Sequence, residues 1–487
     1  LFFGVLNTKP EDRRALFEAE QWNLSLLKEW EKVPYLNGGL FERDTIDNER
    51  VIFSEELFER TFEFFSRYNF TIDENDPEDT QIGIDPEMLG KIFENLLEDN
   101  KDKGAFYTPK EIGQYMCRES LIAYLTEKHK EEEVNIRNLV EKHNTKWEED
   151  TCKKVLNSLK EVKICDPAIG SGAFPMGMLN ELYKCRIALG EEKSVNIKKE
   201  ILQNNIYGVD IEKGAVDIAR LRFWLALVVD ESIPEPLPNL DFKIMQGNSL
   251  LESYQGVDLS HIGEDDEVLM DEQMSFDFGD SYKTAKQLAV FSKINKEQIQ
   301  KLMNEYFATT ENKKVKLKEI NNIIEGKIHT KIYLEKEKVS SLTKEFFKKF
   351  GLKSEKDLKE KIDLGSISEK GKEYKKYLTN KKRLAELDII EEELLSFQTK
   401  IERPYFLWHL YFKEAFDKGG FDIVIGNPPY VSTTGVPKED KPLLEYEFGF
   451  SDDLYNHFFI KGNQILRNKG VLSLFENLVI PPQLYQV

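Results

Sequence analysis

The sequence predicts an α/β fold, a doubly wound and mostly parallel sheet with a helical region before it and a long helical insertion inside it. Two observations predict this class. Short apolar runs that fit buried strands are followed by glycine or acidic residues and then by helical patterns, an alternation typical of parallel sheets. A charged stretch from about 285 to 400, almost without proline, predicts helices between the third and fourth strands.

Residues 1–100 are expected to be mainly helical, because Phe53–Phe70 carries apolar residues at helical spacing. After them, Gly104–Glu111 has the features of a helix start. Thr108 is the expected N-cap, Pro109 suits the first helical position and Glu111 would close a capping box.

The first strand is expected at Val162–Cys165 and is followed by a glycine-containing loop and a helix from about Pro175 to Leu189. Gly170 and Gly172 allow a backbone to approach a ligand where a Cβ would collide. A dinucleotide fold would place a third glycine at the helix start to seat a pyrophosphate. Phe174 and Pro175 stand there instead, so the sequence indicates a cofactor without a pyrophosphate.

The second strand, Ile206–Asp210, ends in a carboxylate where doubly wound folds place the acid that binds ribose hydroxyls. Asp210 is the predicted ribose ligand, and a helix N-cap is its alternative role. A third strand, Phe242–Met245, leads into Gln246–Leu250, where Asn248 is placed to read an adenine edge.

The fourth strand, Phe421–Gly426, leads into the tetrapeptide Asn427-Pro428-Pro429-Tyr430. An amino group on a heteroaromatic ring is a poor nucleophile because its lone pair is delocalised. The Asn427 side-chain carbonyl and the Pro428 backbone carbonyl, held by two prolines of fixed φ, can each accept one N–H of such a group. Tyr430 offers a face on which a base can stack. Alone, the tetrapeptide would also fit an ordinary turn, and Tyr430 a packing aromatic.

Downstream, Asp453-Leu454-Tyr455 is expected to open a helix, and Gly470–Phe475 is the expected fifth strand. The run Phe223–Val229 is too short to span a membrane and fits a core helix.

Taken together, these segments resemble the motifs of gamma-class N6-adenine DNA methyltransferases, in the order that defines the class: motif X at 104–111, motif I at 166–174 and motif IV at 427–430. The segments Pro34–Phe41 and Arg403–Phe406, and the long spacer that precedes Arg403, look like those of the Eco57I-type or type IIG restriction-modification enzymes. The methylases of BREX phage defence are close cousins. The resemblance covers about residues 1–255 and 401–487.

The resemblance implies a Rossmann-like class I methyltransferase that binds S-adenosylmethionine and methylates N6 of an adenine flipped out of duplex DNA. Asn427, Pro428, Pro429 and Tyr430 would be catalytic. The implied cofactor-binding residues are Phe106, Tyr107, Thr108, Asp166, Ala168, Gly170, Gly172, Phe174, Asp210, Ile211, Asn248, Ser249, Leu250 and Asn427. Many relatives carry Asp at the position of Asn248. No metal site is expected.

The implied organisation is a helical connector over 1–100, the cofactor half of the core over 101–255, an acidic loop with the helical insertion over 256–400 and the catalytic half over 401–487. A recognition domain and the second base-stacking aromatic, of motif VIII, would lie past Val487. A nuclease or specificity domain is a possible partner outside this sequence. The only nuclease-like pattern, Glu161-Val162-Lys163 after Asp150, is already used by the first strand.

Two other functions fit the same tetrapeptide. Protein methyltransferases that modify a glutamine amide act on a similar planar NH2 group, although those enzymes are shorter and lack the long insertion. A non-catalytic DNA-binding subunit of a defence system could retain the fold, although intact motifs argue against it.

The charge fits DNA binding least well. The formal net charge is −20 over 487 residues, whereas neutralising phosphates supplies most non-specific affinity for DNA. Two explanations remain: a recognition domain missing from this sequence binds the duplex, or the charges are segregated along the chain. Segregation is visible, because residues 263–280 are strongly acidic and Lys313–Lys382 is rich in lysine. That helical insertion fits either a solvated hairpin or a contact to the DNA backbone.

Cysteine usage and hydropathy give expectations about location. The four cysteines lack metal-ligand spacing and fit reduced thiols in a cytoplasm. The start of the sequence has no secretory pattern and no apolar run reaches membrane length, so a soluble protein is expected.

Overall fold

A computed structural model of the chain describes residues 2–6, 8–31, 33, 35, 54–66, 108–228, 240, 242–255, 257–260, 296–308, 313–397, 405–438 and 440–475. It divides into two compact units. The first comprises residues 1–250, 414–438 and 451–487, and the second comprises 251–413 and 439–450. The domain boundaries expected from the sequence stay a prediction.

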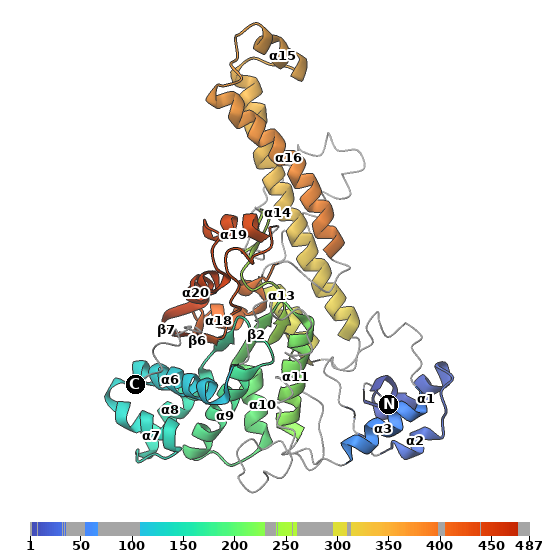
Figure 1. Cartoon of the computed structure of the whole chain (residues 1–487), viewed down its shortest axis with the longest axis vertical. Coiled ribbons are helices and arrows are strands. Elements are labelled where there is room, and N and C mark those ends of the chain that lie inside the picture. The colour runs from blue at the N-terminus through green and yellow to red at the C-terminus, as the bar shows by residue number, and fades with distance from the viewer. Residues whose placement is uncertain are drawn as a thin grey trace, which may run out of the picture. The chain divides into compact units, whose positions relative to one another are not determined.

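The first unit is built on a parallel sheet. In the described part of the chain its strands are β1 (Ile164–Asp166), β2 (Ile206–Asp210), β3 (Ile244–Gln246), β6 (Phe421–Gly426) and β7 (Leu466–Leu474), in the order β3-β2-β1-β6-β7. Every neighbouring pair is parallel. Figure 1 shows the sheet with helices packed around it. The predicted doubly wound α/β fold is confirmed.

Helices of this unit surround the sheet and share its core. They are α6 (Lys110–Lys128), α7 (Glu133–Lys142), α8 (Glu149–Glu161), α9 (Ala173–Ala188), α10 (Val195–Asn204), α11 (Lys213–Val228) and α20 (Leu454–Ile465), with a short 3-10 turn, η3, at Lys130–Glu132. Phe223 and Leu227 of α11 are buried in the core. This segment is therefore a core helix as predicted, and none of the described helices is both long and apolar enough to cross a membrane.

The N-terminal region is helical where it is described. It contains a π-helix η1 (Phe2–Leu6), α1 (Pro10–Ala19), α2 (Leu26–Glu29) and α3 (Glu55–Phe65). The Arg13 guanidinium is buried and donates to the carbonyl oxygens of Thr8, Val5 and Val33 at 3.0 to 3.1 Å. One side chain thus joins three separate backbone segments.

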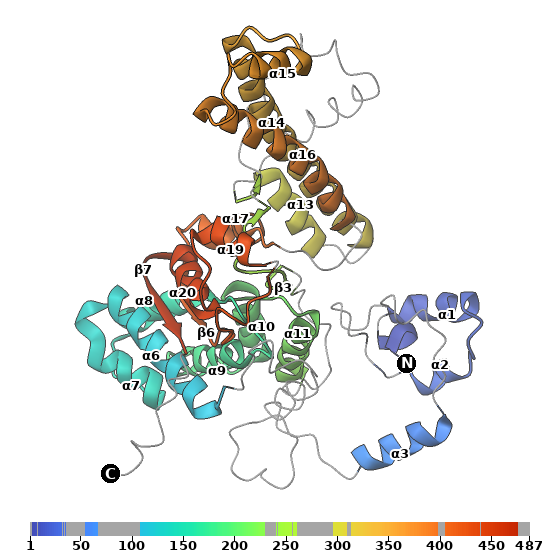
Figure 2. The ribbon, with the colours of Figure 1, turned by 45° about the horizontal axis from the view of Figure 1, so that its top comes forward.

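The second unit contains the predicted helical insertion. Its elements are β4 (Ser253–Tyr254), β5 (Val257–Asp258), α13 (Lys296–Ala308), α14 (Lys313–Lys349), α15 (Glu355–Asp363), α16 (Lys372–Phe397), α17 (Trp408–Tyr411) and α19 (Asp440–Phe448). Helix α18 (Lys413–Phe416) lies at the boundary of the units. Figures 1 and 2 both show α14 and α16 side by side, with α15 at one end of the pair.

Two helix starts differ from the sequence expectation. Helix α6 begins at Lys110 with Pro109 as its N-cap and no side-chain cap, so Thr108 is not the cap residue. Its hydroxyl instead accepts a hydrogen bond from Asn427. Helix α9 begins at Ala173, two residues before Pro175, because Gly172 turns the chain with φ 86°.

The pairing of β1 with β6 joins two halves of the sheet that the insertion separates in sequence. Ile164 pairs with Ile423 and Cys165 with Val424. The Asp422 carboxylate accepts the Lys163 backbone N–H at 2.7 Å and meets the Arg467 guanidinium at 2.7 Å. Asp422 therefore fixes the register of β1, β6 and β7 with one side chain.

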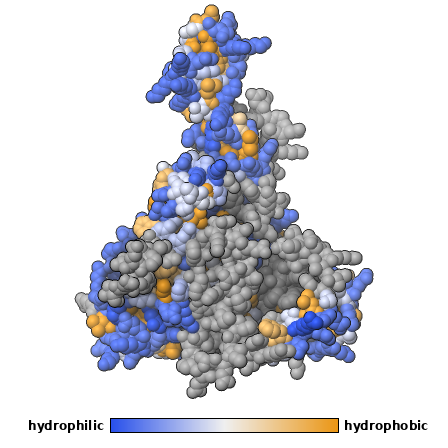
Figure 3. Space-filling view, viewed as in Figure 1, coloured by the Kyte–Doolittle hydropathy of each residue, from blue (hydrophilic) through white to orange (hydrophobic). Residues whose placement is uncertain are grey.

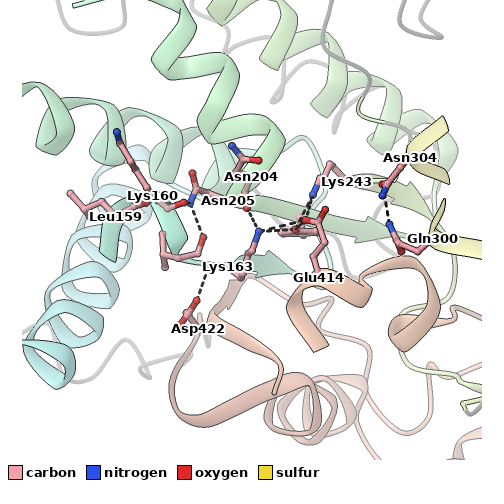
Figure 4. Close-up of polar contacts among 12 residues, drawn as sticks. Leu159, Lys160, Lys163, Asn204, Asn205, Lys243, Gln300, Asn304, Glu414 and Asp422 are labelled. Atoms are coloured by element: carbon pink, nitrogen blue, oxygen red, sulfur yellow. Dashed lines mark hydrogen bonds and ion pairs between the residues drawn. The ribbon is translucent and has the colours of Figure 1, made fainter. Parts of the chain in front are cut away.

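A polar network lies at the amino ends of the parallel strands, which we call the amino edge of the sheet (Figure 4). The Lys163 ammonium donates to the Asn204 carbonyl at 2.6 Å, and the Lys243 ammonium donates to the Tyr207 hydroxyl at 2.8 Å and contacts Glu414 at 3.1 Å. Asn205, fully buried, donates to the carbonyls of Leu159, Lys160 and Val162 at the end of α8. These bonds link β1, β2, β3 and α18.

Removing the Asp422 carboxylate should destabilise the fold. Burial raises the pKa of Asp422 above its usual value, although the Lys163 N–H and Arg467 favour the charged form. Asp422→Ala leaves both partners unsatisfied and should lower the free energy of unfolding by about 3 kcal/mol. Asp422→Asn keeps an acceptor for the N–H and should cost less. Urea unfolding measures both, and equal stability of all three proteins would contradict the role.

The amino-edge network should also give a defined pH dependence. Burial lowers the pKa of Lys243 to about 8, whereas an unfolded lysine titrates near about 10.4. Between these values the unfolded chain binds more protons, so the free energy of unfolding rises with pH. From pH 7 to about 9.5, the protein should gain about 2 kcal/mol relative to Lys243→Gln. Urea unfolding at both pH values checks this, and a constant or shrinking difference would refute it.

Candidate active site at the carboxyl edge of the sheet

The carboxyl ends of the parallel strands bring the predicted site segments to one edge. Asp166 ends β1, Asp210 ends β2 and Gly426 ends β6. Because β1 lies between β2 and β6, the loop after β1 has the Asp210 loop on one side and the Asn427 loop on the other. The strand order reverses beside β1, and such switch points hold ligands in open α/β sheets.

The loop after β1 uses its two glycines differently. Gly170 has φ 52°, and no described atom lies within 4 Å of the position that a Cβ would take. Gly172 has φ 86°, and a Cβ there would lie 3.2 Å from the Ala219 Cβ. Gly172 is therefore needed for packing, whereas Gly170 presents bare backbone on an open face. The Gly170 N–H donates to the Asp210 carboxylate at 2.8 Å, which ties the loop to β2.

Two acids flank this loop: Asp166 is buried, and Asp210 is partly exposed. Asp166 accepts the Ala168 N–H at 3.0 Å through Oδ1, while no described group bonds its Oδ2. Burial raises the pKa of Asp166 well above the usual range, and the charge of Asp210 adds to the effect. Burial also raises the pKa of Asp210, which accepts the N–H of Glu212 and of Gly170. An unsatisfied buried carboxylate oxygen favours a ligand that brings a donor or a positive charge.

The segments after β2 and β3 add an apolar face and a polar turn. The Ile211 side chain, directly after Asp210, is 60% exposed. The Gln246 amide holds this segment by donating to the Ile211 carbonyl at 3.1 Å. Asn248 accepts the Leu250 N–H at 3.1 Å, and the side chains of Ser249 and Leu250 are buried. An exposed isoleucine beside a partly exposed acid suits a ligand with a flat ring next to a ribose.

Asn427 follows β6 and contacts the segment that precedes α6. Its amide nitrogen donates to the Thr108 hydroxyl at 3.1 Å, so two segments 319 residues apart in sequence meet here. Gly426 allows the β6 end to approach β1, because a Cβ at Gly426 would lie 2.6 Å from the Asp166 Oδ1. Pro428 is buried, whereas Pro429 is partly exposed.

The Asn427 carbonyl oxygen already has a partner in this structure. It accepts the Tyr430 hydroxyl at 2.9 Å, and that hydroxyl also lies 2.5 Å from the Phe475 carbonyl oxygen after β7. A tyrosine hydroxyl carries one hydrogen, so it can satisfy one of these acceptors at a time. A hydrogen-bond donor that entered the site could therefore replace the Tyr430 hydroxyl at the Asn427 carbonyl oxygen, while that hydroxyl keeps its bond to the Phe475 carbonyl oxygen.

Tyr455 is a site residue that the sequence analysis missed. Its ring lies parallel to that of Tyr430, with centroids 6.1 Å apart and an interplanar angle of 8°. Tyr455 is in the first turn of α20, for which Asp453 is the N-cap. The Asp453 carboxylate accepts the Thr433 N–H at 2.5 Å, which fixes the loop after Tyr430 against this helix. The sequence predicts a helix start at Asp453-Leu454-Tyr455. The aromatic residue at the third position of this segment is the signal that could have indicated a place beside Tyr430.

The structure thus brings Thr108, Asp166, Gly170, Asp210 and Asn427 together. Ala168 is partly exposed on the same loop. The Phe174 side chain is instead 2% exposed and packs in the core with Cys117 and Met178, so only its backbone belongs to the loop. Phe106, Tyr107, Arg403 and Pro404, with most of Pro34–Phe41 and the acidic stretch 263–280, lie outside the described residues.

Among the described residues, no group of three or more His, Cys, Asp or Glu side chains is placed to hold a metal ion. The cysteines Cys117, Cys152, Cys165 and Cys185 carry free thiols. Burial raises the pKa of Cys165, in β1, well above its usual value, as expected for an inert core thiol.

Comparisons with known proteins agree with this geometry. The chain matches the family of Eco57I restriction-modification methylases over residues 204–481 and the MmeI DNA-methyltransferase domain over residues 140–232. A relative from Methanocaldococcus jannaschii, provisionally described as a type II restriction enzyme and methyltransferase, is 28% identical over 97% of this chain. The chain spans 40% of that relative's length. The match to the Eco57I family covers more than half of the residues of this chain. This chain therefore belongs to the Eco57I restriction-modification methylase family.

Proposed function

We propose that this protein transfers the methyl group of S-adenosylmethionine to N6 of an adenine flipped out of duplex DNA, as the modification activity of a type IIG restriction-modification system. The observation that carries the proposal is the position of Asn427. It stands at the switch point of the sheet, bonded to Thr108 and next to the buried carboxylate of Asp166.

Bound S-adenosylmethionine would supply an electrophilic methyl group on a positively charged sulfur. The residues around the β1 loop fit such a ligand. Asp210 and Ile211 would hold its ribose and adenine, and Asn248 would read the adenine edge. The unsatisfied oxygen of Asp166 suits the α-ammonium group of its amino-acid end, and the open backbone at Gly170 leaves room for that end.

Asn427 and Pro428 would activate the target amino group. Each of their carbonyl oxygens accepts one N–H, which draws electron density back onto N6 and stabilises the positive charge that develops there. No general base is required before the bond forms, because the proton can leave after methyl transfer. Placing the two reactants in contact contributes much of the rate.

Tyr430 would have two roles in this reaction. Its ring stacks on the flipped base. Its hydroxyl occupies the Asn427 oxygen until the adenine N6–H replaces it, and the Phe475 carbonyl then accepts the released hydroxyl. The Asn427 carbonyl oxygen therefore always has a hydrogen-bond partner, which avoids the free-energy cost of an unpaired acceptor in a partly buried site.

A restriction activity would come from outside this chain. The relative from Methanocaldococcus jannaschii is described as both a restriction enzyme and a methyltransferase. We place the nuclease and the sequence-recognition function in such a further domain or a partner, and the protein in the cytoplasm, where the DNA is.

Asn427→Ala should lower methyl transfer to DNA by about 100-fold or more, because it removes one of two acceptors that act in the transition state. Binding of S-adenosylmethionine should stay within about threefold, because Asp166, Asp210 and Ile211 keep their proposed contacts to the cofactor and the loss of Asn427 removes at most one. Asn456→Ala, at an exposed asparagine of α20, is the matched control and should retain full activity. Full activity of Asn427→Ala would exclude the proposed role.

Substitution at Tyr430 should separate the ring from the hydroxyl. Tyr430→Ala should lose about 10- to 100-fold in kcat/KM for DNA, the usual cost of losing one base stack. Tyr430→Phe keeps the ring and frees the Asn427 acceptor, so it should stay close to the unmutated enzyme. Steady-state methyl transfer measures both. Equal loss in the two variants would assign the effect to the hydroxyl and contradict stacking.

A further inference from the structure

The end of the α14–α16 pair forms a small folded body, which we call the hairpin tip and define as residues 344–383. It contains the end of α14, all of α15 and the first half of α16. Figure 2 shows α15 at the end of the pair, joining the two long helices. The tip has its own apolar core, formed by Phe346, Leu352, Leu358, Ile367 and Tyr377. The rings of Phe346 and Tyr377 stack with centroids 4.6 Å apart.

The hairpin tip is strongly basic in an acidic protein. Its 40 residues include thirteen lysines and one arginine against seven acidic residues, a net charge of +7 in a chain of −20. Figure 3 shows this end of the molecule, at the top of the view, mostly hydrophilic with apolar residues interspersed. Net charge of one sign, gathered on a single body, attracts a partner of the opposite sign.

Several acidic residues of the tip are used within the tip itself. Glu355 pairs with Lys381 at 2.7 Å and accepts the Tyr377 hydroxyl, which lowers its pKa. Asp357 accepts the Lys353 N–H at 2.7 Å and the Ser354 hydroxyl at the start of α15. These carboxylates stabilise the fold of the tip and do not neutralise its outer lysines.

Most lysines of the tip, here called the outer lysines, point into solvent without an acidic partner among the described residues. These eight are exposed and have no described carboxylate within ion-pair distance: Lys344, Lys348, Lys356, Lys359, Lys370, Lys372, Lys375 and Lys376. Two pairs, Lys344 with Lys348 and Lys372 with Lys376, are four residues apart on one helix, a spacing at which like charges repel. A helix face that served only for solubility would gain from acidic residues at these positions.

The shaft of the same hairpin shows the contrasting arrangement. There Lys336 of α14 pairs with Asp388 of α16 at 2.7 Å and with Glu391, and His329 contacts Glu391 at 3.3 Å. The lysine is thus neutralised across the helix pair. Uncompensated positive charge is a property of the tip rather than of the whole insertion.

We propose that the hairpin tip binds the phosphate backbone of duplex DNA. Duplex DNA carries about one negative charge per 1.7 Å of its axis, and lysines that neutralise it release counterions. Lysine binds phosphates as a flexible point charge, whereas base edges are read mainly by bidentate side chains, most often arginine, and the tip has one arginine. The tip would therefore add affinity without sequence specificity. This inference rests on the proposed function, which makes DNA the substrate.

The test compares three charge variants of the protein. The first changes Lys344, Lys348, Lys372 and Lys376 to glutamine, and the second changes the same four to arginine, which keeps the charge. The matched control changes four exposed lysines of the other unit that also lack an ion pair to a described carboxylate, Lys142, Lys146, Lys154 and Lys193, to glutamine. Fluorescence anisotropy with a labelled duplex, at several KCl concentrations, gives the affinity and its salt dependence.

The glutamine variant of the tip should bind duplex DNA at least about tenfold more weakly, and its slope of log K against log salt should be shallower by about 2 to 4. The arginine variant and the control should bind like the unmutated protein. In methyl-transfer assays the tip glutamine variant should raise KM for DNA and leave kcat unchanged. A tip glutamine variant with the affinity and slope of the control would overturn the inference.

The two proposals can fail separately. If the unmutated protein binds the duplex with the predicted loss in the tip variant but transfers no methyl group to DNA, the proposed function is wrong and the tip inference stands. If it methylates DNA with a KM that the tip variant does not change, the tip inference is wrong and the function stands. No binding of the unmutated protein to duplex DNA would overturn both.

Discussion

The active site depends on one pairing, that of β1 with β6. The strands belong to segments that the helical insertion separates, and Asp422 joins them by accepting the Lys163 N–H and meeting Arg467. The register that results sets Gly426 against Asp166. A shift of the pairing by one residue would turn every side chain of β6 to the opposite face, and Asn427 would no longer stand beside the glycine loop. This pairing holds together the two halves of the sheet that the insertion separates in sequence.

The site combines a buried acid, Asp166, and a partly exposed acid, Asp210, with acceptors that already have hydrogen-bond partners. Asp166 and Asp210 are held at raised pKa by burial, and only Asp166 retains an oxygen that no described group bonds. Asn427 is bonded by Thr108 on one side and by Tyr430 on the other. In the proposed reaction, a positively charged cofactor would meet the unsatisfied oxygen of Asp166, whereas the base would have to replace the Tyr430 hydroxyl at the Asn427 oxygen.

Much of the fold and site could be predicted from the sequence because the signals are local. Strands that end in Asp166, Asp210 and Gly426 are apolar runs bounded by glycine or acid, and the class of sheet follows from their alternation with helices. The tetrapeptide that begins at Asn427 is also a local signal, and the chemistry inferred from its two acceptors stays a proposal. These features need no knowledge of distant contacts.

Other features depend on tertiary contacts and were wrong or missed. Thr108 has the residue type of an N-cap, but its hydroxyl binds Asn427, 319 residues away, and the helix starts two residues later. The stacking of Tyr455 on Tyr430 and the bond from Tyr430 to the Phe475 carbonyl require the β6–β7 pairing, which no local pattern encodes. The charge of the hairpin tip was visible as a lysine-rich stretch, whereas the engagement of its carboxylates was not.

The central claim is that the Asn427 loop directs a methyl group to N6 of adenine. The most direct measurement is to incubate the protein with labelled S-adenosylmethionine and unmethylated bacteriophage DNA, digest the DNA to nucleosides and identify the labelled product. The account predicts label in N6-methyladenine alone. Label in a methylated cytosine, or in protein in place of DNA, would contradict it.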